Sequence, residues 1–108
     1  MTRTELITSI GEVLLRLDKL RKDSMLDEWA RLALIRVRNA LAKQQMLLAI
    51  TDFQENPTAL PAIAKRFQII SIELRRVLDP AEIRNIPPEN LEQLLVAVDS
   101  LISPSLQS

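Results

Sequence analysis

The sequence predicts an all-α fold, a compact bundle of four main helices and one short helix. Along most of the 108 residues, apolar side chains recur at alternating intervals of three and four, as they do on one face of a helix. A single glycine and almost no β-branched alternation disfavour sheets. The length and a hydrophobic content of 47% suit a single domain that spans residues 1–108.

The first helix is expected over residues 4–21. Thr2 or Thr4 is placed to cap it, and Glu5 adds a negative charge to the first turn, where the helix dipole favours one. Gly11 lies inside this helix, where glycine costs about 1 kcal/mol relative to alanine. We therefore expect a second helix to approach closely at Gly11, with a flexible hinge as the alternative. The apolar seam consists of Leu6, Ile10, Val13, Leu17 and Leu20.

The central helix, expected over residues 25–51 with Ser24 as its N-cap, organises the chain because it carries two apolar stripes. The short polar break before it predicts that the first two helices are antiparallel neighbours. One stripe packs on the core, so the other predicts burial between neighbours or a partner surface. The first stripe, which Gln44 interrupts, contains Leu26, Ala30, Ala33, Val37, Ala40 and Leu47, broadened by Leu34, Leu41 and Leu48. The second stripe, which Asn39 interrupts, contains Leu32, Ile35, Ala42, Met46 and Ala49.

The third helix is expected over residues 59–78, with Thr58 as its N-cap. One side has a regular core seam. On the far side, Ile69 and Ile72 lie between two cations, Lys65 and Arg76, and are expected either to pack a second time or to dock a partner.

Prolines divide the last part of the chain. Asp79 before Pro80 predicts a capped short helix over residues 80–85. Ile86 and the two prolines after it break the chain before a last helix over residues 89–102. Aromatic residues make up 3% of the chain, so we expect an aliphatic core, with Trp29 as an anchor within it.

Composition excludes most catalytic chemistry. Without cysteine or histidine, the chain has no thiolate or imidazole for a metal and no histidine general base. Its paired carboxylates lie at predicted helix ends, where acids serve as caps. We therefore expect neither an enzyme, nor a cofactor, nor a metal site. No leader-like segment or apolar run of bilayer length is visible, which favours a cytoplasmic protein.

The charges balance overall, with 14 basic and 14 acidic residues, but they are unevenly distributed. No acidic residue occurs between Trp29 and Thr51. The strips between the two stripes of the central helix carry Arg31 with Arg38, and Arg36 with Lys43. These cations are either solvated helix surface or a track for a phosphate backbone, which arginine binds well.

This pattern resembles the small, all-helical subunits of class 1 CRISPR effector complexes, the Cascade-type surveillance assemblies of antiviral defence. The resemblance covers residues 6–102 and rests on size, helix order and the basic stretch RLALIRVRNALAKQQ. It implies a non-catalytic bundle that packs in several copies along an RNA-guided complex, against other protein subunits. It also implies contact with the backbone of target or displaced RNA or DNA, without sequence specificity.

Carried onto this sequence, the resemblance assigns nucleic-acid backbone contacts to Arg31, Arg36, Arg38 and Lys43, and then to Lys65 and Arg76. Contacts with partner proteins are assigned to Leu32, Ile35, Met46, Ile69 and Ile72. The alternative is a helical protein-interaction module, an adaptor or a homodimeric regulator, with solvated arginines and no nucleic-acid role. Nucleic-acid binding that weakens steeply with salt would separate the two.

Overall fold

Four long helices and one short helix make up the part of the chain that the structure describes. The structure is a computed structural model and describes residues 2–23, 26–51, 58–77, 79–83 and 85–102. No strand occurs in these ranges, so the predicted all-α bundle is confirmed. The helices are α1 (Arg3–Leu20), α2 (Glu28–Ile50), α3 (Ala59–Val77), α4 (Pro80–Ile83) and α5 (Pro88–Asp99).

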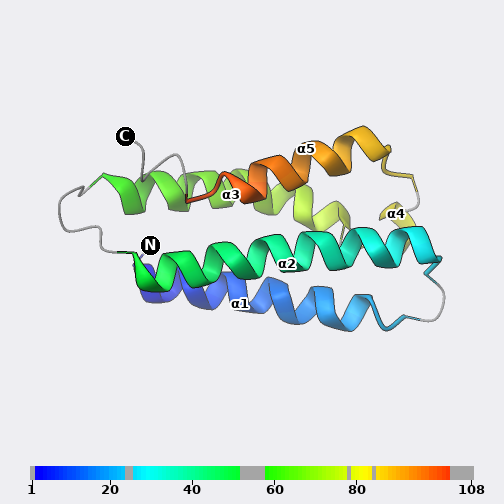
Figure 1. The fold of residues 1–108 in the computed structure, drawn as a ribbon, viewed down its shortest axis with the longest axis horizontal. Coiled ribbons are helices and arrows are strands. Elements are labelled where there is room, and N and C mark those ends of the chain that lie inside the picture. The colour runs from blue at the N-terminus through cyan, green and yellow to red at the C-terminus, as the bar shows by residue number, and fades with distance from the viewer. Residues whose placement is uncertain (1, 24–25, 52–57, 78, 84, 103–108) are drawn as a thin grey trace.

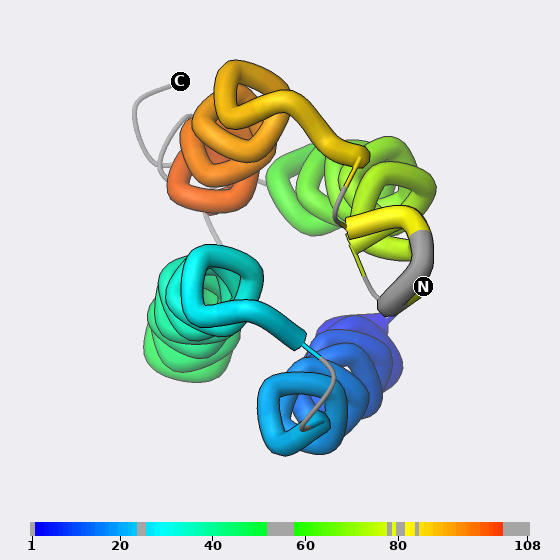
Figure 2. Tube along the Cα trace, turned by 90° about the vertical axis from the view of Figure 1, so that its right-hand side faces the viewer, coloured from blue at the N-terminus to red at the C-terminus, as the bar shows by residue number. Residues whose placement is uncertain are grey.

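The four long helices run alternately in opposite directions along the bundle (Figure 1). In cross-section they occupy four corners, with α2 beside both α1 and α5 and diagonally opposite α3 (Figure 2). The first two helices are antiparallel neighbours, as the sequence predicts. Because α2 and α3 lie at opposite corners, their outward faces point in opposite directions.

Side-chain caps define where the first two helices begin. The side chain of Thr2 accepts a hydrogen bond from the backbone N–H of Glu5 at 3.1 Å, which confirms one of the two predicted caps. The predicted start of α2 is wrong, because Asp27 rather than Ser24 caps the helix, accepting from Ala30 N–H at 2.8 Å. Leu26 is buried just before the helix begins, so its side chain belongs to the core although its backbone precedes α2. Ser24 itself lies outside the described residues.

The core is aliphatic and runs the length of the bundle. The inner side of α2 contributes the first predicted stripe to this core, with Leu34 and Leu41 fully buried. The second stripe lies mostly outside the core: Leu32 and Met46 are more than half exposed, although Ala42 packs against the core. Other fully buried side chains come from every other helix and include Leu6, Ile10, Leu17, Ile63, Ile83 and Val98.

Gln44, the polar interruption of the inner stripe, is 1% exposed and joins α2 to the end of α5. Its amide nitrogen donates to the carbonyl oxygen of Asp99 at 3.1 Å, and its amide oxygen accepts from the N–H of Ile102 at 3.1 Å. The prediction that the last helix extends to residue 102 is therefore wrong: α5 ends at Asp99. Leu101 and Ile102 are fully buried beyond it.

The short helix also ends earlier than predicted, at Ile83 rather than at residue 85. After it, Asn85 N–H bonds to Glu82 C=O at 2.9 Å, and Ile86 N–H bonds to Ile83 C=O at 3.3 Å. These three-residue steps form turns in place of a helix. Pro87 follows and disfavours the helical conformation at Ile86, whose side chain is buried instead.

Gly11 marks a close approach of α1 to α2, as one of its two interpretations predicts. A Cβ atom at this position would lie 3.3 Å from the side-chain nitrogen of Gln45. That nitrogen donates to the carbonyl oxygen of Ile7 at 3.0 Å, so the amide lies across the backbone of α1. The absence of a side chain at Gly11 leaves space for this contact.

Candidate functional site

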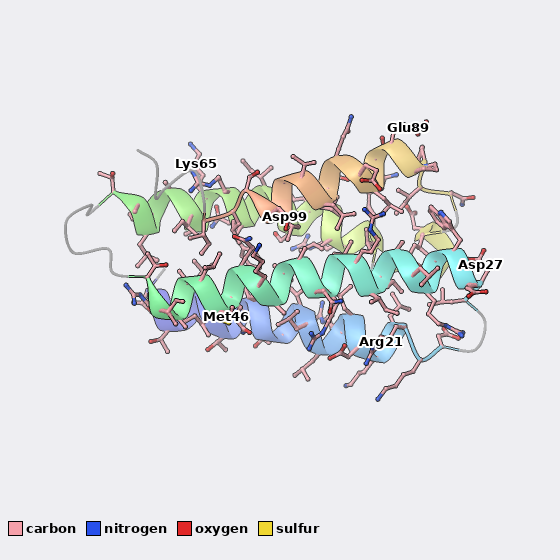
Figure 3. All side chains as sticks on the ribbon, viewed as in Figure 1. Arg21, Asp27, Met46, Lys65, Glu89 and Asp99 are labelled. Carbon is pink, nitrogen blue, oxygen red and sulfur yellow. The ribbon has the colours of Figure 1, made fainter. Side chains whose placement is uncertain are left out.

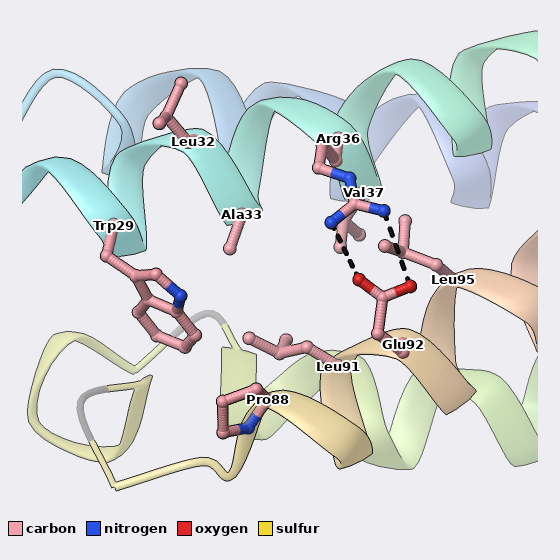
Figure 4. Close-up of a pocket in the computed structure, with 9 residues that line it drawn as sticks. All are labelled: Trp29, Leu32, Ala33, Arg36, Val37, Pro88, Leu91, Glu92 and Leu95. Atoms are coloured by element: carbon pink, nitrogen blue, oxygen red, sulfur yellow. Dashed lines mark hydrogen bonds and ion pairs between the residues drawn. The ribbon is translucent and has the colours of Figure 1, made fainter.

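Arg36, one of the predicted phosphate ligands, forms an ion pair with Glu92 across the α2–α5 groove (Figure 4). Its two terminal nitrogens lie 2.8 and 3.4 Å from the two carboxylate oxygens. Both side chains remain exposed, at 60% and 59%. Hydrogen bonding to Glu92, together with its negative charge, raises the pKa of Arg36 above the ordinary guanidinium value. Arg36 is therefore a fixed positive charge on an accessible surface.

Arg38 lies on the opposite edge of α2 and contacts α1. Its Nε lies 3.2 Å from a carboxylate oxygen of Asp18, which also lies 3.5 Å from Nε of Arg21. The two arginines share one carboxylate, and the Arg38 side chain is 35% exposed. Arg38 therefore links α2 to α1 in addition to supplying charge.

Arg31 supports the connection between α1 and α2. One of its terminal nitrogens donates to the carbonyl oxygens of Asp23, at 3.1 Å, and Leu26, at 3.3 Å. The side chain is half-buried, and its Nε is buried without a hydrogen-bond partner. Arg31 is therefore mainly a structural residue that satisfies backbone carbonyls before α2 begins.

The remaining predicted phosphate ligands are exposed. Lys43 and Lys65 have no ion-pair partner among the residues that the structure describes. Arg76 lies within ion-pair distance of Glu73, at 3.7 Å, and of Glu82, at 3.8 Å. Exposed pairs of this kind contribute little to stability, and a stronger anion can compete for them.

The six predicted cations do not lie on one continuous path. Arg31, Arg36, Arg38 and Lys43 belong to α2, whereas Lys65 and Arg76 belong to α3 at the diagonally opposite corner (Figure 2). A single nucleic-acid strand would have to cross the bundle to touch both sets. The structure thus separates them into two candidate surfaces.

Four of the five predicted partner-binding residues are strongly exposed. On α2, Leu32 is 55% and Met46 is 57% exposed, while Ile35 between them is half-buried. On α3, Ile69 and Ile72 are each 60% exposed. Neither apolar face is covered by another described helix, so both remain available for contact. In the following we call Leu32, Ile35, Asn39, Ala42, Met46 and Ala49 the outer seam of α2.

Shallow grooves flank α5 on both sides. The groove between α2 and α5 has a volume of about 250 Å³ and is lined by Trp29, Arg36, Leu91 and Glu92 among others (Figure 4). Trp29 is 43% exposed there, so the prediction of a buried anchor is wrong. It lies in the first turn of α2, where the core is already filled by Ala30 and Leu26. The groove between α3 and α5, of about 310 Å³, includes Ile69.

No group of three or more acidic, cysteine or histidine side chains in the described ranges is arranged to hold a metal ion. Among the same residues, no helix is long and apolar enough to cross a membrane.

Sequence reasoning missed the acids that meet the central arginines. Glu92 lies 56 residues from Arg36, and Asp18 lies 20 residues from Arg38. The acid-free run of α2 predicts cations without partners within the helix, but neighbouring helices supply the partners. The only signal for Glu92 is its place on α5 beside residues of the apolar stripe.

Comparison with known proteins gives no relatives, because no family description, no curated protein and no solved structure matches this chain.

Proposed function

We propose that this chain is a non-catalytic, protein-binding subunit of a larger assembly, which attaches through the outward faces of α2 and α3. The observation that carries the proposal is the exposure of Leu32, Met46, Ile69 and Ile72, each by more than half. These residues have the spacing of packed helical seams, yet no described helix covers them. Groups of exposed aliphatic residues on helices are typical of protein contact sites.

The arrangement of the two faces suits a subunit that lies between neighbours. Because α2 and α3 occupy opposite corners, a protein on one face does not obstruct the other (Figure 2). Such a subunit can join two different proteins, or serve as a spacer that is used several times. Its place in the cell is proposed to be the cytoplasm.

The proposal is tested by affinity purification from the native cell, with recovered proteins quantified by mass spectrometry. Three variants are compared with the wild type: Leu32→Gln with Met46→Gln on α2, Ile69→Gln with Ile72→Gln on α3, and Val96→Gln on α5. Val96 is 64% exposed but lies outside both faces, which makes it the matched control. We expect a fixed set of proteins that at least one face variant loses and the control retains. Equal recovery with all variants would refute the proposal.

A second candidate is a small subunit of a class 1 CRISPR effector complex, in which α2 also touches nucleic-acid backbone. It is supported by Arg36 and Lys43, which lie exposed along one border of the outer seam. The pair between Arg36 and Glu92 is solvated, and a phosphate could replace the carboxylate because guanidinium binds both in a bidentate manner. Arg31 and Arg38 support this candidate less, since backbone carbonyls and Asp18 already engage them.

This candidate predicts that the purified assembly contains RNA of uniform length and that DNA or RNA binding weakens steeply as salt is added. Reversal at Lys43 (Lys43→Glu) should weaken binding and reduce the slope of log affinity against log salt. The matched control is Lys22→Glu, the same change at an exposed lysine that belongs to neither set of candidate cations. Protein partners recovered without RNA, and no salt-sensitive binding in the assembly, would remove this candidate and leave the interaction subunit.

A further inference from the structure

The outer seam of α2 has the spacing of a coiled-coil surface. Its six positions, which run from Leu32 to Ala49, follow one another at alternating steps of three and four. This repeat lets the side chains of one helix enter the spaces between those of another. At 1.5 Å per residue the seam is about 26 Å long, or nearly five helical turns. It is therefore long enough to hold a whole helix.

We propose that this seam is the docking site for one helix of a partner protein, and that the partner helix carries acidic residues beside its own apolar seam. The proposal rests on the proposed function and specifies the chemistry of the partner at one of its two faces. It concerns α2 alone and makes no use of α3.

Burial supports docking at this seam. Leu32 and Met46 lie near its two ends and are exposed by more than half, while Ile35 and Ala42 are half-buried, Ala42 against the core. The exposed side chains are therefore free to pack between the side chains of a partner helix, and the half-buried ones lie beneath them. Figure 3 places Met46 on the side of α2 away from α5, where no other helix lies in front of it.

The neighbouring part of α1 enlarges the apolar surface. Gly11 and Asp18 of α1 both meet α2, through Gln45 and Arg38 respectively. Leu15 lies on the same stripe of α1, four residues after the first and three before the second, and it is 63% exposed. Leu15 therefore borders the seam about halfway along its length.

The charges around the seam select an acidic partner. Positions beside a coiled-coil seam usually carry the ion pairs that determine which helix binds. Here these positions hold Arg36 and Lys43 on the border toward α5, and Arg31 and Arg38 on the border toward α1. No acidic residue interrupts α2 beyond its first turn. Three of these cations already have partners within the chain: Arg31 binds backbone carbonyls, Arg36 pairs with Glu92, and Arg38 pairs with Asp18. A partner helix with Glu or Asp at its own flanking positions would therefore pair first with Lys43 and compete with Glu92 for Arg36, whose existing pair is solvated.

The same charges disfavour a second copy of this chain. In an antiparallel pair of α2 helices, Arg36 of one copy would lie beside Lys43 of the other. In a parallel pair, Arg38 of one copy would lie beside Lys43 of the other, and Arg31 beside Arg36. Both orientations place like charges together over a narrow apolar seam. We therefore expect the isolated chain to remain a monomer at this face.

Asn39 gives the proposed contact a defined register. It is exposed near the middle of the seam, with apolar residues on both sides. A polar residue at a single seam position favours the alignment that places another polar group opposite it, at some cost in affinity. The partner helix is thus expected to carry one polar residue at the middle of its own seam.

The test uses two synthetic peptides of three heptads with Leu at the seam positions and one central Asn. One peptide carries Glu at the flanking positions and the other carries Lys. Binding to the full chain is followed by fluorescence anisotropy of the labelled peptides, and self-association of the chain is followed by sedimentation. We expect the acidic peptide to bind roughly tenfold or more tightly than the basic peptide, a difference that disappears at high salt.

Variants distinguish the seam from the rest of the surface. Leu32→Gln and, independently, Met46→Gln should each weaken binding of the acidic peptide. Lys43→Glu should reduce the difference in affinity between the acidic and the basic peptide. Ile69→Gln, a matched loss of an exposed isoleucine on α3, should leave binding unchanged. Equal binding of the two peptides, no binding of either, equal sensitivity to Ile69→Gln, or a dimer that Leu32→Gln dissociates would each overturn the proposal.

The outcomes also separate this inference from the proposed function. If cellular partners depend on Leu32 and Met46 but the acidic peptide has no advantage, the interaction subunit stands and the acidic-helix inference fails. If no cellular partner depends on either face, the proposed function fails, whatever the peptides show.

Discussion

The two apolar faces of α2 have similar side chains but different surroundings. Leu34 and Leu41 on the inner face are fully buried, whereas Leu32 and Met46 on the outer face are more than half exposed. Each face also contains one side-chain amide. Gln44 on the inner face bonds to two backbone groups of the C-terminal segment, whereas Asn39 on the outer face is exposed. Periodicity therefore identifies an apolar face, but the neighbouring helices determine whether that face belongs to the core.

The largest expected contrast is between truncations on the two faces. Leu41→Ala should lower the free energy of unfolding by about 2–5 kcal/mol, because it leaves a cavity in a filled core. Leu32→Ala, the same change on the outer face, should alter it by no more than about 0.5 kcal/mol. Urea unfolding followed by circular dichroism measures both values. Similar losses for the two variants would mean that both faces are packed in solution.

The two amides provide the next contrast. Gln44→Ala leaves the buried N–H of Ile102 and the partly buried carbonyl of Asp99 without their partner, at a cost of about 1–3 kcal/mol. Asn39→Ala removes an exposed amide from a helix and should be neutral or slightly stabilising, since alanine is the better helix former. The free energies of unfolding of the two variants, measured by urea unfolding, test this difference. Equal values would show that the bonds of Gln44 are replaced by water.

Arg31 lies at the N-terminal end of the border between the outer seam and α1. Arg31→Ala should destabilise the chain by about 1–2 kcal/mol, because the carbonyls of Asp23 and Leu26 lose a charged donor. Lys43→Ala, on the other border, removes a cation without a described partner and should change stability by less than about 0.5 kcal/mol. Thermal unfolding of both variants at equal concentration makes the comparison. If Arg31→Ala left the stability unchanged, Arg31 would not be a structural residue and its guanidinium would be available to bind phosphate.

The smallest effect is expected for Arg36 and Glu92. A double-mutant cycle with Arg36→Ala and Glu92→Ala should give a weak coupling that salt reduces, because both groups are solvated. The folded-state pKa of Arg36 is raised, so its stabilising contribution is present below the ordinary guanidinium pKa and is lost only as the pH rises through the raised value. Between neutral pH and about pH 11, the arginine side of this pair should therefore cause no change in stability. A coupling that grows with salt would contradict this picture.

Local patterns predicted the helices well, and contacts between distant residues explain most of what they missed. The three-and-four spacing identified the four long helices, and Asp79 before Pro80 identified the short one. Thr2 was one of two expected caps, and all of these signals lie within a few residues. The predicted end of α5 was wrong because the chain after Asp99 is held by Gln44, which lies 55 residues earlier in the sequence. For the same reason the acidic partners of Arg36 and Arg38 were not predicted. The sequence suggested the outer seam, but only the arrangement of the helices shows that no described helix covers it.

The two hydrogen bonds of Gln44 constrain the number of residues between the end of α5 and Ile102. The amide binds the carbonyl of Asp99 and the N–H of Ile102 together, and these two groups are three residues apart in the chain. One residue inserted between Ser100 and Leu101 would move the N–H out of place, and one residue removed would pull Leu101 and Ile102 out of their buried positions. Point substitutions at exposed positions of α5 leave this spacing intact. Between Asp99 and Ile102 we therefore expect insertions and deletions to be tolerated less well than substitutions at the exposed positions of α5.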